Sequence, residues 1–173
     1  QRTRLTDEEV IARCPWATTG RTHHRTPNII TSLELDPAEM EKRNIHLQKK
    51  YAEIEENEVR FEELHCEDSE YLIVAFGSCA RIAQKAMEMA REEGIKVGLL
   101  RPITLWPFPS KAIAARAAQV KGILTVELNA GQMVEDVRLA VKCKVPVEHF
   151  GRLGGIVPDP DEVITALKEK LIK

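Results

Sequence analysis

The stretch EYLIVAFGSCARIAQKAMEMAREEGIKVGLLRPITL, residues 70–105, contains a complete strand–helix–strand unit and decides the fold. Tyr71–Phe76 is an unbroken apolar run that is too short for a helix, which is typical of a strand covered on both faces. Ser78 is a candidate N-cap for a helix that ends at Gly94, and the apolar run resumes at Ile95–Leu100. A strand, a crossover helix and a second strand predict a parallel βαβ unit with a right-handed connection.

The alternation of strands and helices continues to the end of the chain. Further strands are predicted at residues 122–128 and 145–150, and helices at residues 110–120, at residues 132–142 with Asn129 as the cap, and after Asp159. Upstream, residues 59–64 alternate apolar and charged side chains as an edge strand does, and this strand is the candidate for an antiparallel orientation. The residues therefore predict an α/β fold of four parallel strands with a fifth strand at the edge.

The N-terminal third differs from this pattern. Thr6 and Glu9 form a capping-box pattern for a short helix, and Asp36 followed by Pro37 predicts the start of a longer one. We expect residues 1–57 to be a linker segment with helices and residues 58–173 to be the α/β domain. The longer helix carries a narrow apolar stripe, which packs either on its own domain or on another domain or subunit: Met40, Leu47, Tyr51 and Ile54.

Composition excludes several classes of protein. Lys and Arg number 25 against 27 Asp and Glu, a formal charge of −2, so nothing indicates binding of nucleic acid or of an anionic membrane. The charges are unevenly distributed along the chain, because residues 51–70 carry nine acidic residues and one basic residue. This segment predicts a solvated acidic face. The sequence has no apolar run long enough for a bilayer span and no signal-peptide pattern, so we expect a soluble, cytoplasmic protein. A first residue other than Met indicates a fragment or processed product.

The cysteines and histidines do not predict a metal site. Four scattered cysteines include no Cys-x-x-Cys pair, so we expect free thiols and neither a zinc site nor an iron–sulfur cluster: Cys14, Cys66, Cys79 and Cys143. Cys79 lies near a predicted helix N-terminus, where it is either a small packed residue or an acidic thiol. His23 and His24 are adjacent, so their side chains diverge on most backbones, and no third ligand lies at a useful spacing.

Functional groups in an open parallel sheet collect in the loops after the strands. The candidate ligand or interface residues in these loops are Gly77, Ser78, Arg101, Thr104, Asn129, Gln132, Arg152 and Gly154. Neither G-x-G-x-x-G nor G-x-x-x-x-G-K-[ST] is present, which removes the best support for nucleotide binding. Asn129 and Gln132 are expected to tie the loops together, with Asn129 as helix cap. Glu127 is expected either to reach solvent or to pair with Arg101 or Arg152.

Three runs are specific enough to show a resemblance. LLRPITLWPFP (residues 99–109), ILTVELNAGQMVEDVRLAV (residues 123–141) and FGRLGGIVPDPDEV (residues 150–163) resemble the carboxy-terminal domain (core domain II) of the alpha subunit of 2-oxoacid:ferredoxin oxidoreductases of the 2-oxoglutarate or 2-ketoisovalerate type. The resemblance implies a fold like the carboxy-terminal domain of transketolase, a three-layer α/β/α sandwich whose five-stranded, mostly parallel sheet has one antiparallel edge strand.

The resemblance also implies a reaction and partners. Such enzymes oxidatively decarboxylate a 2-oxoacid with thiamine diphosphate and magnesium, pass electrons through iron–sulfur clusters to ferredoxin, and release an acyl-coenzyme A. The implied partners are the other domains and the beta-, gamma- and delta-type subunits, with ferredoxin as an indirect partner. The residues around thiamine lie in a preceding domain of that family, so we expect no catalytic residue and no bound cofactor in this chain.

Two functions of different classes remain open. The chain is either a non-catalytic domain that serves subunit assembly and access of coenzyme A, or an independent α/β module that binds a ligand with its strand-end loops. An autonomous enzyme is disfavoured because the motifs assemble no nucleophile, base or metal cluster. Trp106 and Phe108 lie between prolines and are expected to dock on another domain or subunit, the alternative being that they cover the domain's own helix.

Overall fold

The computed structural model describes residues 4–14, 16 and 32–172, and these form two compact units, residues 1–46 and residues 47–173. The histidine pair at residues 23 and 24 lies outside the described residues. The domain boundary expected at residue 58 stays a prediction. None of the described helices is both long and apolar enough to cross a bilayer.

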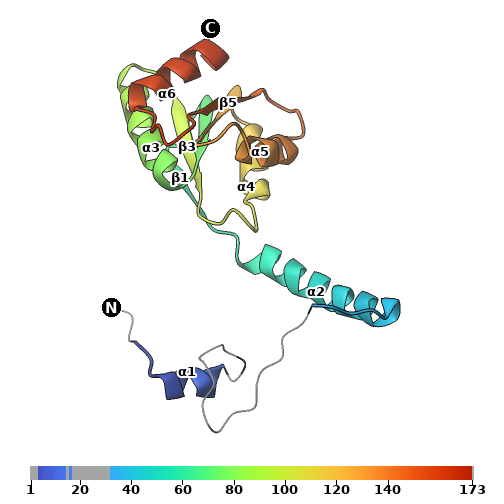
Figure 1. Ribbon diagram of the computed structural model, residues 1–173. Coiled ribbons are helices and arrows are strands. Elements are labelled where there is room, and N and C mark those ends of the chain that lie inside the picture. The colour runs from blue at the N-terminus through green and yellow to red at the C-terminus, as the bar shows by residue number, and fades with distance from the viewer. Residues whose placement is uncertain (1–3, 15, 17–31, 173) are drawn as a thin grey trace. The chain divides into compact units, whose positions relative to one another are not determined.

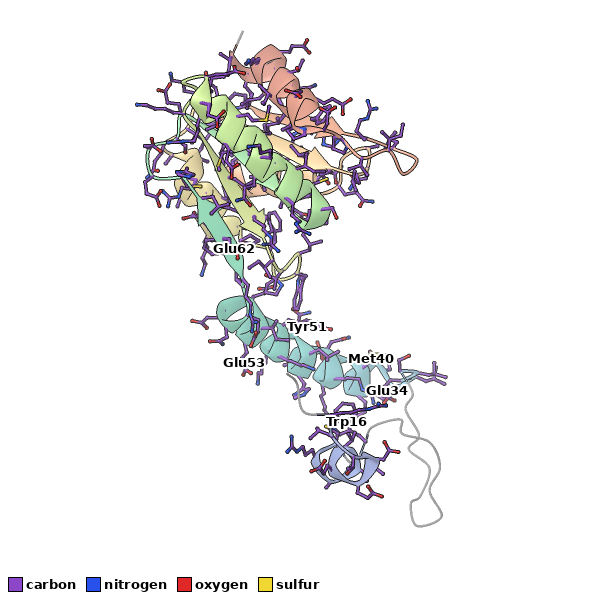
Figure 2. All side chains as sticks on the ribbon, turned by 90° about the vertical axis from the view of Figure 1, so that its left-hand side faces the viewer. Trp16, Glu34, Met40, Tyr51, Glu53 and Glu62 are labelled. Carbon is purple, nitrogen blue, oxygen red and sulfur yellow. The ribbon has the colours of Figure 1, made fainter. Side chains whose placement is uncertain are left out.

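The first unit contains helix α1 (Asp7–Arg13) and the start of helix α2 (Pro37–Asn57). The capping box predicted at Thr6 and Glu9 is confirmed, because each side chain accepts a hydrogen bond from the other residue's backbone N–H. Asp36 accepts hydrogen bonds from two first-turn amides of α2, as predicted. No residue of α2 is buried, although the predicted apolar stripe is present. Figure 2 shows Tyr51 and Glu53 projecting from opposite sides of this helix.

The second unit is a three-layer sandwich around one sheet (Figure 1). The sheet consists of β1 (Phe61–Leu64), β2 (Tyr71–Ala75), β3 (Val97–Pro102), β4 (Gly122–Glu127) and β5 (Val147–Gly151) in the order β1-β3-β2-β4-β5. Strand β1 is antiparallel to β3, and all other pairs are parallel. The predicted sheet, including the antiparallel edge strand, is therefore confirmed.

The helices cover both faces of the sheet. Helices α3 (Gly77–Glu92) and α6 (Pro160–Leu167), with the short π-helix η1 (Lys168–Ile172), cover one face, while α4 (Ser110–Ala117) and α5 (Met133–Val141) cover the other. Alternate side chains of each central strand enter the two cores, so Ile73 packs under α3 and Leu72 packs under α4 and α5. This alternation explains why β2 is apolar without a break.

One predicted helix start is wrong. Helix α3 begins at Gly77, with Phe76 in the extended N-cap position, and the cap makes no side-chain hydrogen bond. Ser78 therefore lies in the first turn and does not cap the helix. Gly77 has φ +56°, a left-handed conformation that glycine adopts without strain, and the N-cap lies two residues earlier than predicted. The predicted end of the helix is confirmed by the positive φ of Gly94.

The acidic segment at residues 51–70 is not simply a solvated face. Six of its nine carboxylates lie within 4.0 Å of a basic group in the part of the chain that the structure describes: Glu58 with Arg60, Glu62 with Arg101, Glu63 and Glu67 with Arg116, Asp68 with Arg91, and Glu70 with Lys121. All of these pairs except Glu58 with Arg60 link β1 or the loop after it to other parts of the second unit. The three carboxylates with no such pair all lie near the end of α2: Glu53, Glu55 and Glu56.

Candidate functional site

The carboxyl ends of strands β2, β3, β4 and β5 meet at one edge of the sheet, where the chain continues into the loops that precede the helices. All of the predicted loop residues lie at this edge, but they form separate groups. Arg101 is the second-to-last residue of β3 and Thr104 follows that strand, Gly77 and Ser78 follow β2, and the remaining residues follow β4 and β5.

Glu127, the last residue of β4, is the most fully enclosed charged residue at this edge, with 1% of its surface exposed. Its carboxylate accepts hydrogen bonds from three backbone N–H groups at the start of α5: Gln132 (3.2 Å), Met133 (2.8 Å) and Val134 (3.0 Å). These amides have no partner within the helix, and the negative charge interacts favourably with the positive end of the helix dipole. Glu127 therefore caps α5 from the neighbouring strand.

His149 on β5 completes this buried cluster. Its Nδ1 lies 3.4 Å from a carboxylate oxygen of Glu127 and 3.3 Å from Oγ1 of Thr125, a buried residue on β4. The side chain of His149 is 21% exposed, so it is mostly enclosed, and its Nδ1 faces the acid. The cluster joins β4, β5 and α5. Sequence reasoning did not identify His149, and both expectations for Glu127 were wrong.

The predicted caps and ion pairs at this edge differ from those observed. Asn129 does not cap α5, because its side-chain oxygen accepts a hydrogen bond from the N–H of Gly131 at 2.7 Å, which closes a turn within the loop. Gln132 occupies the N-cap position without a side-chain cap bond. Arg101 pairs with Glu62 at 2.8 Å and Arg152 pairs with Glu162 at 3.3 Å, so neither arginine faces Glu127.

A close backbone approach holds the loops after β4 and β5 together. A Cβ atom on Gly151 would collide with the carbonyl oxygen of Asn129 and would lie 2.6 Å from Nε2 of His149. The N–H of Arg152 also donates to the backbone oxygen of Glu127 at 3.3 Å. Position 151 therefore requires glycine because the two loops are in contact there and leave no room for a Cβ atom. The backbone conformation of Gly151 does not itself require glycine.

Thr104 holds the loop after β3 in place. Its hydroxyl accepts from the N–H of Arg60 at 3.0 Å and donates to the carbonyl of Pro107 at 2.8 Å, which ties the loop to the segment before β1. Phe108 is half-buried and packs against the core under α4, so the alternative that it covers its own domain holds for this residue. Trp106 is 54% exposed and its ring meets Tyr51 edge to face at a centroid distance of 5.6 Å.

The cysteines are all free, and the environment of two of them opposes thiol chemistry. Burial raises the pKa of the Cys79 thiol, and the negative charge of Glu127 raises it further, so the acidic-thiol alternative is wrong. Burial also raises the pKa of Cys66, to about 11. In the portions of the chain that the structure describes, no group of three or more His, Cys, Asp and Glu residues has the arrangement of a metal site.

Comparison with known proteins first defines the fold class. The chain resembles a solved split-gene transketolase in its inactive beta4 tetramer, with a TM-score of 0.56 and 18% identity over 65% of this chain and 42% of that chain. A second solved structure, 2-oxoglutarate:ferredoxin oxidoreductase from Magnetococcus marinus with 2-oxoglutarate, coenzyme A and succinyl-CoA bound, gives a TM-score of 0.68 and 25% identity over 79% of this chain and 24% of that chain. The fold is thus of the transketolase-like α/β class.

Residues 69–163 match the pyruvate:ferredoxin oxidoreductase core domain II family, and the chain belongs to this family. The ketoisovalerate oxidoreductase subunit VorB of Methanothermobacter thermautotrophicus is 45% identical over 94% of this chain and 46% of its own length. The 2-oxoglutarate synthase subunit KorA of Methanothermobacter marburgensis is 32% identical over 58% of this chain and 27% of its own length. This chain therefore spans less than half the length of these curated relatives. The resemblance inferred from the three sequence runs is confirmed.

Proposed function

We propose that this chain is a non-catalytic part of the alpha subunit of a 2-oxoacid:ferredoxin oxidoreductase and that it serves assembly of the complex. The observation that carries the proposal is the family membership of residues 69–163 together with the long match to VorB. The proposed complex decarboxylates a 2-oxoacid oxidatively with thiamine diphosphate and forms an acyl-CoA while ferredoxin is reduced. Its other domains and subunits are the partners of this chain.

The charged residues at the strand ends support a non-catalytic role. Glu127 is committed to the first turn of α5, while Arg101 and Arg152 each pair with a carboxylate. The buried thiols of Cys66 and Cys79 have raised pKa values, which disfavours a thiolate nucleophile at neutral pH. Among the described residues, no group of three or more His, Cys, Asp and Glu residues is arranged to hold a metal ion, which supports the proposal that thiamine diphosphate and magnesium bind elsewhere in the complex. Isothermal titration of the chain with thiamine diphosphate and magnesium should show no binding, and micromolar binding would contradict this assignment.

The match to VorB favours a branched-chain 2-oxoacid as the substrate of the complex. The identity is 45% over 94% of the chain for VorB but 32% over 58% for KorA. The purified complex should therefore reduce ferredoxin faster with 2-ketoisovalerate than with 2-oxoglutarate, with at least a tenfold difference in kcat/KM in the presence of coenzyme A. The reverse preference would refute the substrate, and a chain that enters no such complex would refute the proposed function.

A second role, contact with coenzyme A, is favoured by exposed glycine backbone at the edge of the sheet. Gly77 and Gly154 both have positive φ, and a Cβ at either position would meet no atom within 4 Å. Such exposed backbone can approach a ligand closely. Coenzyme A that binds the complex but not the isolated chain supports a role in access. Coenzyme A that binds the chain alone supports the independent ligand-binding module instead.

A further inference from the structure

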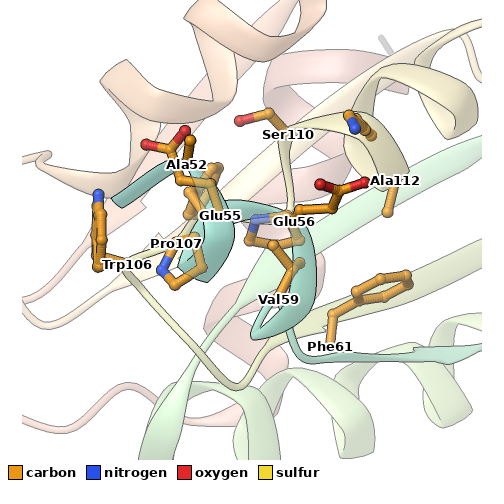
Figure 3. A pocket seen from close by; sticks show the side chains of 12 residues that line it. Ala52, Glu55, Glu56, Val59, Phe61, Trp106, Pro107, Ser110 and Ala112 are labelled. Carbon is orange, nitrogen blue, oxygen red and sulfur yellow. The ribbon is translucent and has the colours of Figure 1, made fainter. Parts of the chain in front are cut away.

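A groove of about 990 Å³ lies between the last turns of α2 and the segment from Trp106 to Ala112 (Figure 3). Its walls come from the C-terminal part of α2, the start of β1, the loop after β3 and the first turn of α4. All of these elements belong to the second unit. The groove is partly open to solvent, so it has the form of a binding surface for an extended segment and not of a closed cavity.

The walls of the groove are largely apolar. Val59, Phe61 and Trp106 contribute side chains, and two of these are large and remain accessible, with 39% of Phe61 and 54% of Trp106 exposed. Pro107 and Pro109 fix the backbone beside Trp106, so the groove does not need to reorder its wall when a partner binds. Exposed aromatic side chains on a rigid wall are typical of the centre of a protein–protein contact.

Two glutamates at the rim of the groove have no ion-pair partner among the described residues. Glu55 and Glu56 line it, and neither forms an ion pair within the described residues, whereas six of the nine acids in residues 51–70 do. The last turn of α2 contains no basic residue, so the negative end of the helix dipole adds to these two charges. Lys111 is the one basic side chain among the lining residues. The groove therefore presents an apolar floor with an excess of negative charge along α2.

The geometry points to one occupant: a protein segment with aliphatic side chains and with lysine or arginine residues next to them. The aliphatic side chains would cover Phe61 and Trp106, and the basic groups would pair with Glu55 and Glu56 and with the carbonyl end of α2. The assignment of this segment to another subunit of the oxidoreductase rests on the proposed function. The chemistry of the groove does not depend on it.

Peptide binding by the full chain tests the chemistry. Three fluorescent 12-residue probes differ only in composition: Lys with Leu, Glu with Leu, and Lys with Ser. We expect the Lys–Leu probe to bind at least tenfold more tightly than either of the other two, and its affinity to fall as salt is raised. Glu55→Gln with Glu56→Gln, and separately Trp106→Ala, should each weaken it about fivefold or more. Equal binding of all three probes, or affinities unchanged in both variants, would overturn the proposal.

A matched variant controls for net charge. Glu41→Gln with Glu92→Gln removes the same two charges at exposed positions outside the groove, and should leave the affinity for the Lys–Leu probe unchanged. An equal loss in this control would assign the binding to overall charge and would overturn the groove as the site. Circular dichroism and gel filtration of every variant exclude misfolding or a new oligomeric state as the cause of weaker binding.

Photo-crosslinking in the purified complex tests the source of the segment. With p-benzoylphenylalanine at position 112, on the groove wall, the cross-linked peptide should come from another subunit and contain both aliphatic and basic residues. A cross-link to a second copy of this chain, or none in an intact complex, would overturn the assignment to a subunit. Failure to form any complex would instead count against the proposed function, while the peptide probes would still decide the chemistry of the groove.

Discussion

The buried carboxylate of Glu127 should be worth more to stability than any side chain in the loop that follows it. Glu127→Gln keeps the size of the side chain but replaces one acceptor oxygen with an NH₂ group. In the structure one oxygen accepts from Gln132 and Met133 while the other accepts from Val134. The amide of glutamine has one acceptor oxygen, whereas the carboxylate has two. At least one backbone N–H at the start of α5 therefore loses its acceptor.

The magnitude follows from these contacts. An unpaired buried N–H costs about 1–3 kcal/mol. Loss of the negative charge at the helix N-terminus costs about 0.3–2 kcal/mol more. The uncharged side chain also avoids the desolvation cost of a buried carboxylate, which offsets part of this sum. We therefore expect Glu127→Gln to lower the free energy of unfolding by about 2–3 kcal/mol, a large share of the 5–15 kcal/mol that is usual for a domain.

Urea unfolding followed by circular dichroism measures this loss, and hydrogen exchange of residues 132–141 shows whether it is centred on α5. Glu148→Gln on the neighbouring strand is the matched control, since the structure gives the Glu148 side chain no hydrogen bond or ion pair among the described residues, and it should cost less than about 0.5 kcal/mol. Asn129→Ala removes only the turn bond to Gly131 and should cost about 0.5–1.5 kcal/mol. If Asn129→Ala destabilises the chain more than Glu127→Gln, the reasoning is wrong and the cap lies where the sequence first placed it.

Three further predictions concern the same domain. Arg116→Ala leaves Glu63, which is 22% exposed, without its two-bond partner and should cost about 1–3 kcal/mol in urea unfolding, against less than about 0.5 kcal/mol for Arg60→Ala in an exposed pair. Burial raises the pKa of Cys66 from 9.0 to about 11, so the folded chain holds the thiol proton more tightly than the unfolded chain does. The protonated thiol therefore contributes about 2–3 kcal/mol to the free energy of unfolding. This contribution is complete below pH 9 and is lost as the pH rises through 11. Cys66→Ala should flatten this decline between pH 9 and 11, and an unchanged slope would count against burial as its cause. Gly151→Ala should separate the loops after β4 and β5 and lower the free energy of unfolding by about 1–3 kcal/mol. Gly154→Ala is the control, because the added Cβ would contact no atom and would destabilise the chain only through the strain of its positive φ.

Most of the fold was predictable because each element carries its own signal. The strands β2 and β4 are unbroken apolar runs because helices cover both of their faces, and β1 alternates because it lies at an edge. Capping residues Thr6, Asp36 and Asp159 are confirmed because each acts on amides only two or three residues away. Short-range signals of this kind require no knowledge of the tertiary structure.

The cap of α5 could not be predicted in the same way, because it depends on residues that are not adjacent. Glu127 reaches amides five to seven residues further along the chain, and His149 approaches it from the next strand. Asn129 had the usual position of a cap, but its side chain bonds the nearer N–H of Gly131. One signal was available: a carboxylate in an otherwise buried strand must find donors, and the free amides of the following helix are the nearest ones.

Two pairs of glutamates in this chain distinguish a role in folding from a role in recognition. Glu63 and Glu127 are buried or half-buried and saturated with hydrogen bonds, so their replacement should lower stability whether or not a partner is present. Glu55 and Glu56 stand at the groove without a partner in the described chain, so their replacement should leave stability almost unchanged. Assembly of the complex should be weakened more by replacement of Glu55 and Glu56 than by replacement of Glu63 or Glu127. If Glu55→Gln with Glu56→Gln unfolds the chain but leaves assembly intact, these two glutamates belong to the folding group and the groove is not a contact site.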